Sequence, residues 1–261
     1  MEIITFSATK GGVGKTTLTY NFGEWLADKG NNVLLIDSDH QCSLSQTYEI
    51  FKTSGTLAEI FTNNGDNVEI EHIKDNLSLI TASMDLDKIN NAIQNKANKE
   101  LIFYMWLADN YDELKSFDYI LIDCHPDFST ITQNMIAVSD KVFSPLEPSE
   151  YSFISKSNLE LRFDDFKKEI INVETRKSLV TAELYFLGNR IKHNTKSSRE
   201  FVPTLKSDPN VIVLIPEKEL FNKSTLNHMS LVDMKKNKEI YRKHKQFFDD
   251  LDNTFETMSE T

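Results

Sequence analysis

Long apolar runs and cysteines are both scarce in this sequence of 261 residues. No run comes near the roughly 18 apolar residues that a membrane-spanning helix needs. The N-terminus has no basic-then-apolar leader with a cleavage site, so we expect a cytoplasmic protein. The two cysteines, Cys42 and Cys124, are too few for a disulfide framework and lack the Cys/His clustering of a zinc site, so we expect reduced thiols. Basic residues are also in the minority, since 29 Lys and Arg face 40 Asp and Glu and give a formal charge of −11. Taken over the whole chain, that balance argues against binding to nucleic acid, because phosphate neutralisation needs Lys and Arg.

Short, continuous apolar runs rich in β-branched residues recur along the chain. They comprise residues 3–6, 33–36, 77–80, 119–122, 142–143, 184–187 and 211–215. Longer stretches with helical spacing lie between them, such as Leu18, Phe22 and Trp25, closed by Gly30. This alternation predicts an α/β fold, with a mostly parallel, twisted sheet of buried strands and helices on both faces. Because there is no low-complexity linker, we favour a single domain over residues 1–261.

Two segments need separate predictions. Residues 53–76, with Gly55, Gly65 and several Asn, predict a short helix within surface loops. Residues 235–258 carry apolar side chains at spacings of three and four, which predicts a closing helix whose apolar face docks on the sheet. A helix on a membrane surface would need basic residues near its end, whereas this segment ends among acidic residues, so we expect no membrane binding.

The strongest functional signal is the glycine-rich stretch of residues 7–17, Ser-Ala-Thr-Lys-Gly-Gly-Val-Gly-Lys-Thr-Thr. It follows the first predicted strand and opens the first predicted helix. Its glycines let backbone N–H groups turn inward to phosphate oxygens, and the helix directs its positive end at the same anion. The predicted nucleotide-binding residues of this loop are Lys10, Gly11, Gly12, Val13, Gly14, Lys15, Thr16 and Thr17.

The end of this loop carries the polar groups of a phosphate site. Lys15 is placed to supply a charge near the β- and γ-phosphates, Thr16 a hydroxyl to Mg²⁺, and Thr17 a hydrogen bond to phosphate. The usual pattern GxxxxGK[ST] requires a glycine where Thr9 stands. The loop matches instead the variant KGGxGK[ST], which adds Lys10 at its start.

With two further motifs, that variant resembles the deviant Walker A group of P-loop ATPases, and its ParA/Soj partition branch in particular. Residues 33–45 (VLLIDSDHQCSLS) are similar to the second switch motif, usually VLLIDxDPQGNLS, with His40 in place of Pro and Cys42 in place of Gly. Residues 117–126 (FDYILIDCHP) are similar to the Walker B segment, usually DYIIIDxPP, with His125 replacing the first Pro. The resemblance covers almost the whole chain. It implies a P-loop NTPase domain that binds ATP and Mg²⁺ and forms a homodimer with ATP.

Three aspartates follow apolar strands near the phosphate loop. Asp123 is suited to hold Mg²⁺ through water, together with Thr16. Asp37 and Asp39 lie where open α/β sheets place their ligands. The resemblance implies that Asp39 orients or activates the attacking water, and that Asp37 supports the metal shell. It also implies that Lys10 reaches across a two-fold dimer to the partner's ATP, as a cation supplied in trans beside Lys15.

The remaining candidates near the nucleotide each have an ordinary structural alternative. Asn189 resembles the strand-end Asn that contacts adenine in the wider superfamily, and Pro216 lies where backbone atoms flank the base. Turn formation is the alternative for both. We expect His40 and His125 to be turn or packing residues rather than catalytic ones. We expect both cysteines to be small buried residues rather than iron–sulfur ligands.

The charge is unevenly distributed along the chain. Residues 190–245 contain 13 Lys and Arg against six Asp and Glu, a balance of +7, and the remainder therefore carries −18. A basic C-terminal third is where ParA-like dimers are thought to hold DNA nonspecifically, through phosphate contacts. The predicted DNA-binding residues are Lys192, Lys196, Arg199 and Lys223, and an ordinary solvated basic face is the alternative.

The resemblance favours a partition ATPase. In that function ATP forms a dimer that coats DNA in the nucleoid, and a ParB-like, centromere-bound partner stimulates slow hydrolysis. The alternative is a MinD-like ATPase switch that positions a complex at the membrane, which the acidic end of the closing helix disfavours. We do not expect a repressor with an N-terminal helix-turn-helix, because the phosphate loop begins at residue 10. A bacterial tyrosine kinase would carry a C-terminal tyrosine cluster, whereas only Tyr241 lies beyond residue 185.

Overall fold

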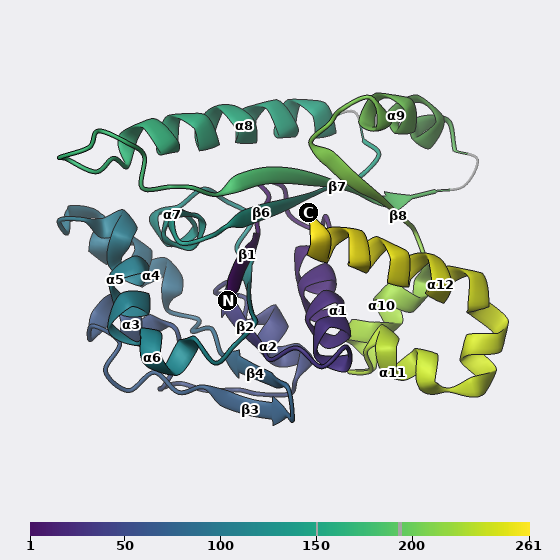
Figure 1. Cartoon of the computed structure of the whole chain (residues 1–261), viewed down its shortest axis with the longest axis horizontal. Coiled ribbons are helices and arrows are strands. Elements are labelled where there is room, and N and C mark those ends of the chain that lie inside the picture. Colours follow the sequence, from purple (N-terminus) through teal and green to yellow (C-terminus); the bar gives the residue numbers. More distant parts are fainter. Residues whose placement is uncertain (150, 193–194) are drawn as a thin grey trace.

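The described part of the chain forms one α/β domain around an eight-stranded sheet (Figure 1). The computed structural model describes residues 1–149, 151–192 and 195–261, without the side chains of residues 196 and 197. The strands lie in the order β3-β4-β2-β5-β1-β6-β7-β8, and all neighbours are parallel except β3 and β4. Their bounds are β1 Glu2–Phe6, β2 Val33–Ser38, β3 Glu71–Lys74, β4 Leu77–Ile80, β5 Tyr119–Cys124, β6 Lys141–Leu146, β7 Glu183–Ile191 and β8 Val211–Pro216. The predicted α/β fold with a mostly parallel sheet is confirmed.

Helices cover both faces of this sheet, which is why its central strands are continuous apolar runs. In β2, Val33 and Leu35 pack into the core on one face, while Leu34 and Ile36 pack into the core on the other. Successive side chains of a strand point to opposite faces, so both sides of β2 must be apolar.

One face carries the N-terminal helix and the C-terminal helices (Figure 1). They are α1 Lys15–Asp28, α2 Ser43–Thr47, α10 Glu219–Leu226, α11 Leu231–Lys236 and α12 Lys238–Glu260. The predicted closing helix of residues 235–258 is in fact two helices, because the side chain of Asn237 caps the N–H groups of Glu239 and Ile240 and starts α12 there. As predicted, α12 contacts the sheet, at β8. It also packs on α1, where the Phe255 ring lies 5.4 Å from that of Phe22.

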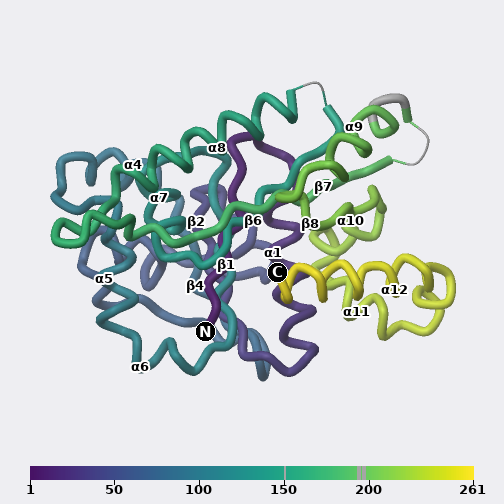
Figure 2. The backbone as a smooth tube through the Cα atoms, turned by 45° about the horizontal axis from the view of Figure 1, so that its top comes forward, coloured from purple at the N-terminus to yellow at the C-terminus, as the bar shows by residue number. Residues whose placement is uncertain are grey.

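The other face carries the remaining helices, with α8 running along β6 and β7 in both views (Figures 1 and 2). They are α3 Ala58–Thr62, α4 Leu86–Ala92, α5 Ile102–Asp109, α6 Tyr111–Leu114, α7 Thr130–Ala137, α8 Ser152–Glu169 and α9 Lys196–Lys206, with 3₁₀ turns at Ile93–Asn95 and Lys99–Leu101. Helix α3 confirms the short helix predicted in residues 53–76. Strand β3, in the same segment, was not predicted. Within the described ranges, no helix combines the length and the apolar character needed to cross a bilayer.

Candidate functional site

The glycine-rich loop joins β1 to α1 at the carboxyl ends of the central strands. Gly12 and Gly14 have φ values of 77° and 95°, in the left-handed region that glycine adopts at little cost. A Cβ at Gly14 would lie 2.6 Å from Nδ2 of Asn189, so space also excludes a side chain there. The turn therefore requires glycine at these two positions for its shape alone.

Helix α1 begins directly at this loop without a side-chain cap. The N–H groups of its first turn are thus available to an anion, which the helix dipole also favours. Lys15, Thr16 and Thr17 form that turn, and Lys15 is buried. Burying an ammonium group is costly unless an opposite charge compensates it, so this place favours an anionic ligand.

Two cavities meet at the loop. One, of about 430 Å³, is lined by Lys15 and Thr16 and by Asp39 across from them. The other, of about 240 Å³, lies between α1, β7, β8 and α10 and is lined by Asn189 and Pro216. Three residues line both cavities: Gly14, Thr17 and Arg190. The space is therefore extended, with one end at the phosphate loop and the other beside the predicted adenine contacts.

Asp123, near the end of β5, faces the first turn of α1. Its Oδ2 accepts a hydrogen bond of 2.6 Å from the Thr16 hydroxyl. Its Oδ1 is buried and has no hydrogen-bond partner among the described residues. A buried carboxylate oxygen without a partner needs an explanation, and with a neighbouring hydroxyl it offers the hard oxygen donors that Mg²⁺ prefers. Thr16 and Asp123 therefore fit a Mg²⁺ ion.

Asp37 lies beside Asp123 because β2 and β5 pair in that register. Its Oδ2 accepts hydrogen bonds from the Ser45 N–H at 2.8 Å and the Ser45 hydroxyl at 2.7 Å. Its Oδ1 accepts one from the Asp39 N–H at 3.2 Å. Asp37 thus anchors α2 and the loop before it, and its place in a metal shell stays a prediction.

Burial raises the pKa of both carboxyl groups. The pKa of Asp123 rises to about 8, through burial and then the charge of Asp37, although the charge of Lys15 and the hydrogen bond from Thr16 oppose the rise. The pKa of Asp37 rises to about 6 through burial, against the hydrogen bonds from Ser45. A cation bound here would favour the ionised form of both acids.

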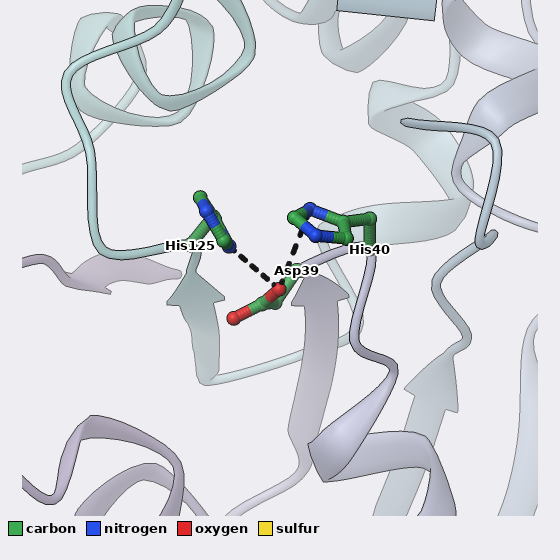
Figure 3. Close-up of side chains that lie close together, drawn as sticks. All are labelled: Asp39, His40 and His125. Carbon is green, nitrogen blue, oxygen red and sulfur yellow. Dashed lines mark hydrogen bonds and ion pairs between the residues drawn. The ribbon is translucent and has the colours of Figure 1, made fainter. Parts of the chain in front are cut away.

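Asp39 lies at the rim of the phosphate-side cavity and is held by groups that the sequence did not connect to it. Its Oδ1 accepts the Gln41 N–H at 2.9 Å and lies 2.8 Å from Nδ1 of His125 (Figure 3). His40 Nδ1 lies 3.8 Å from the same oxygen. Both histidines therefore lie beside Asp39, and their expected role as turn or packing residues rather than catalytic ones stays a prediction.

The two cysteines differ in burial. Cys124 is fully buried, as expected, whereas Cys42 is only half-buried, and both are free thiols. Cys42 has a φ of 53° and caps α2 from the left-handed region. The loop therefore keeps a backbone shape suited to glycine although cysteine stands there.

Lys10 lies at the edge of the site, and its ammonium group bonds within its own chain. Its Nζ lies 3.0 Å from Oε1 of Glu147 and 3.2 Å from the Ser149 hydroxyl. Glu147 also faces Arg190, whose Nη1 donates to the Gly12 carbonyl at 2.6 Å. From the sequence, Glu147 had no predicted role at the nucleotide, and Arg190 was counted only among the basic residues of 190–245.

Asn189 and Pro216 both line the second cavity, as their predicted role requires. Nδ2 of Asn189 donates to the Val13 carbonyl at 2.8 Å, which ties the end of β7 to the phosphate loop. A base could therefore use the second N–H of Nδ2 and the Oδ1 of this side chain.

Two of the four predicted DNA-binding residues, Lys192 and Arg199, line one cavity beside Pro216, and their role in DNA binding stays a prediction. Lys192 pairs with Glu217 at 3.4 Å, and Arg199 is exposed on α9. Lys196 begins α9, but its side chain lies outside the described part of the chain. Lys223 lies on α10. Burial is the main cause that lowers the pKa of His244, and the charges of Lys218, Lys243 and Lys223 lower it further. These three lysines therefore lie near one another, although Lys218 and Lys243 were not among the predicted DNA-binding residues.

Comparison with known proteins identifies the family. Residues 1–179 match the model of the AAA_31 family, described as an AAA domain. The chain belongs to the AAA_31 family. It is a ParA/MinD-type P-loop NTPase, and the resemblance drawn from its motifs is confirmed. The basic third of the sequence begins beyond the matched residues.

Two relatives in sequence and one solved structure are similar to this chain. The chromosome-partitioning ATPase Soj of Treponema pallidum is 33% identical over 56% of this chain and 57% of its own length. Maintenance of carboxysome distribution protein A of Synechococcus elongatus is 28% identical over 88% of this chain and 92% of its own length. A putative plasmid partition protein of Borrelia burgdorferi, solved bound to AMPPNP, superposes with a TM-score of 0.73 at 24% identity, over 95% and 97% of the two chains.

Some relatives are matched over only part of their own length. The chain spans 52% of the length of an uncharacterized Mycobacterium tuberculosis relative that is 34% identical over 172 residues. Like Soj, that relative matches this AAA_31 chain over little more than half of its own length.

Proposed function

We propose that this chain binds ATP with Mg²⁺ and hydrolyses it slowly, as a molecular switch. The observation that carries this proposal is the extended space at the phosphate loop, with Asp123 presenting an unpartnered oxygen beside Thr16. Its phosphate end offers N–H groups and Lys15, and its other end has room for a base. The AMPPNP bound to the Borrelia relative, which has the same fold, supports a nucleotide here.

The residues divide the work of phosphoryl transfer as follows. The loop N–H groups and Lys15 hold the phosphates, and Asp123 and Thr16 hold Mg²⁺, which neutralises charge when bound. The Asp39 carboxylate lines the same cavity as Lys15 and Thr16 and orients the attacking water. Asp37 acts through α2 and the loop that carries Asp39.

ATP-dependent dimerisation is the second part of the proposal. In it Lys10 leaves Glu147 and reaches the nucleotide of a second copy, where its charge stabilises the transition state. The exchange is feasible because the Lys10 side chain is 36% exposed, and a pair so exposed is weak.

Sedimentation with a nonhydrolysable ATP analogue tests nucleotide binding and dimerisation together. We expect the parent chain to sediment as a dimer with the analogue and as a monomer without it. Lys15→Ala should lose analogue binding, and Lys10→Ala should keep binding but lose the dimer and at least about tenfold in hydrolysis rate. Lys88→Ala, which changes an exposed lysine on α4, is the matched control. If Lys10→Ala dimerised and hydrolysed ATP like the parent, the role in trans would be refuted.

The cellular role that we propose is DNA partition, with nonspecific DNA holding the ATP dimer on the nucleoid and a ParB-like partner stimulating hydrolysis. The similarity to Soj supports it, as does the basic C-terminal third. Positioning of a protein cargo is a second candidate, favoured by the carboxysome distribution protein, which matches most of both chains. The two differ in the partner, so a pull-down with the ATP-bound form should recover a centromere-binding protein in the first case only.

The MinD-like alternative has less support. The apolar side chains of α12 from Phe247 to Met258 are packed into the core, and that face is therefore not available to lipid. The exposed part of its end is acidic, which anionic lipid would repel.

A further inference from the structure

Two imidazole rings converge on the carboxylate of Asp39 (Figure 3). Nδ1 of His125 lies 2.8 Å and Nδ1 of His40 lies 3.8 Å from Asp39 Oδ1, and the ring centroids are 4.3 Å apart. One ligand atom from each residue lies within 4.8 Å of the others. In the described ranges, this is the one group of three or more His, Cys, Asp and Glu side chains that meets that criterion.

The sheet places these donors. Strands β2 and β5 pair through Ser38 and Cys124, so the next residues, Asp39 and His125, leave the sheet side by side. The side chains of Asp39, His40 and His125 remain 11%, 19% and 27% exposed, so an ion from solvent can reach them. His40 Nδ1 also lies 3.3 Å from Oδ1 of Asp87, an exposed carboxylate, and this nitrogen must carry no proton when it binds a metal ion.

Two imidazoles and one carboxylate suit a borderline transition metal, whereas Mg²⁺ prefers oxygen donors. Zn²⁺ binds His nitrogen and carboxylate oxygen at about 2.0–2.2 Å, so two donors at tetrahedral positions lie about 3.3–3.5 Å apart. Asp39 Oδ1 lies 2.8 Å from Nδ1 of His125, which is shorter than this donor spacing, and 3.8 Å from Nδ1 of His40, which is longer. Small side-chain rotations would bring both distances to the spacing of tetrahedral donors. We propose that Asp39, His40 and His125 form a site for a Zn²⁺-like transition-metal ion, separate from the Mg²⁺ pair of Thr16 and Asp123.

The effect of this ion on hydrolysis rests on the proposed function. Asp39 is the residue proposed to orient the attacking water, and a metal ion bound at this site would be coordinated by the same carboxylate. A loaded site therefore slows hydrolysis. The phosphate loop contributes none of the three donors. Nucleotide binding is therefore retained while turnover falls.

Titration of the nucleotide-free, chelator-treated protein with Co²⁺ tests the site, followed by visible absorption and calorimetry. We expect one Co²⁺ per chain, displaced by Zn²⁺ and retained in millimolar Mg²⁺. His40→Ala and His125→Ala should each weaken Co²⁺ binding at least about tenfold. His125→Gln, checked for folding by circular dichroism, serves as the conservative second variant.

Two variants separate this site from other donors. His72→Ala removes an exposed histidine of β3, and Cys42→Ser removes the thiol nearest in sequence to His40; both should bind Co²⁺ like the parent. Unchanged affinity in the His40 and His125 variants, or an equal loss in the controls, would overturn the proposal.

The ATPase measurement tests the consequence separately. With excess Mg²⁺, one equivalent of Zn²⁺ should lower the rate of the parent severalfold, while His125→Gln should keep its own metal-free rate. A parent rate that does not change with the site loaded would overturn the inhibitory role. An inactive metal-free parent that still binds Co²⁺ would count against the proposed ATPase and not against the metal site.

Discussion

Asp123 combines deep burial with a free carboxylate oxygen, and this combination makes the stability of the nucleotide-free protein depend on pH. Its pKa is about 8 in the folded chain, against an ordinary value of 3.8. Between those two pH values the unfolded chain ionises this carboxyl group while the folded chain keeps it protonated. Rising pH therefore favours unfolding, and stability is greatest below the unfolded value.

Asp123→Asn should remove this dependence, because the amide resembles the protonated acid and does not titrate. In chelator without nucleotide, we expect the Tm of the variant to exceed that of the parent at pH 8 by at least about 2–4 °C, and by less at pH 5. Asp112→Asn, at an exposed carboxylate, is the control and should follow the parent. Parallel melting curves for parent and Asp123→Asn across this range would show that Asp123 is already ionised when folded.

Single residues also show where sequence reasoning succeeds at this site. The phosphate loop and the aspartates at strand ends could be predicted because each is specified by its immediate neighbours. The contacts of Lys10 with Glu147 and of Asp39 with His125 could not, since they join residues 137 and 86 positions apart. Only the order of strands in the sheet brings these pairs together.

Among the elements, α12 depends on a cluster of aromatic rings that joins the C-terminus to α1. Phe255 is fully buried, and its ring lies 5.4 Å from that of Phe22 and 5.9 Å from that of Trp25. Removing the ring leaves a cavity lined by side chains that cannot all collapse into it. We expect Phe255→Ala to lower the free energy of unfolding by about 3–5 kcal/mol, measured by urea denaturation.

The neighbouring Glu256 provides the comparison. It is exposed on the same helix turn, so Glu256→Ala should change the free energy of unfolding by less than about 0.5 kcal/mol. A small loss in Phe255→Ala would mean that α12 is only loosely docked.

The elements themselves were predictable in proportion to their burial. All seven apolar runs proved to be strands, because a parallel sheet covered on both faces requires continuous apolar residues. Strand β3 was missed since its residues, Glu71–Lys74, are polar apart from Ile73 and its pairing is at the sheet edge. The break before α12 was missed because residues 235–239 are all polar and carry no apolar spacing that could mark it, and the capping by Asn237 is visible only in the structure.

Over the whole molecule, ion pairs decide how much of the basic C-terminal third is available to DNA. Lys235, Lys236 and Lys245 pair with Asp252, Asp28 and Asp249. By contrast, Lys218, Lys223 and Lys243 have no ion-pair partner among the described residues. We call these three the α10–α12 lysines. The pKa of His244 is lowered mainly by burial and further by the charges of these three lysines. The lowering by charge indicates a local positive potential.

Replacing the α10–α12 lysines by alanine should therefore weaken nonspecific DNA binding by the ATP form. In a plot of the logarithm of the DNA-binding constant against the logarithm of the salt concentration, each phosphate contact contributes about −0.9 to the slope. A dimer that loses three contacts in each subunit should therefore have a slope that is less steep by up to about 5. The matched variant replaces Lys235, Lys236 and Lys245 by alanine and removes the same formal charge. Because each of those lysines lies next to a carboxylate that offsets its charge, although these exposed pairs are weak, the matched variant should lose less affinity and less slope. An equal loss of affinity in both variants would show that net charge, rather than the α10–α12 lysines, governs DNA binding. No loss of affinity in either variant would place any DNA contact elsewhere, and Arg199 on α9 would be the next residue to test.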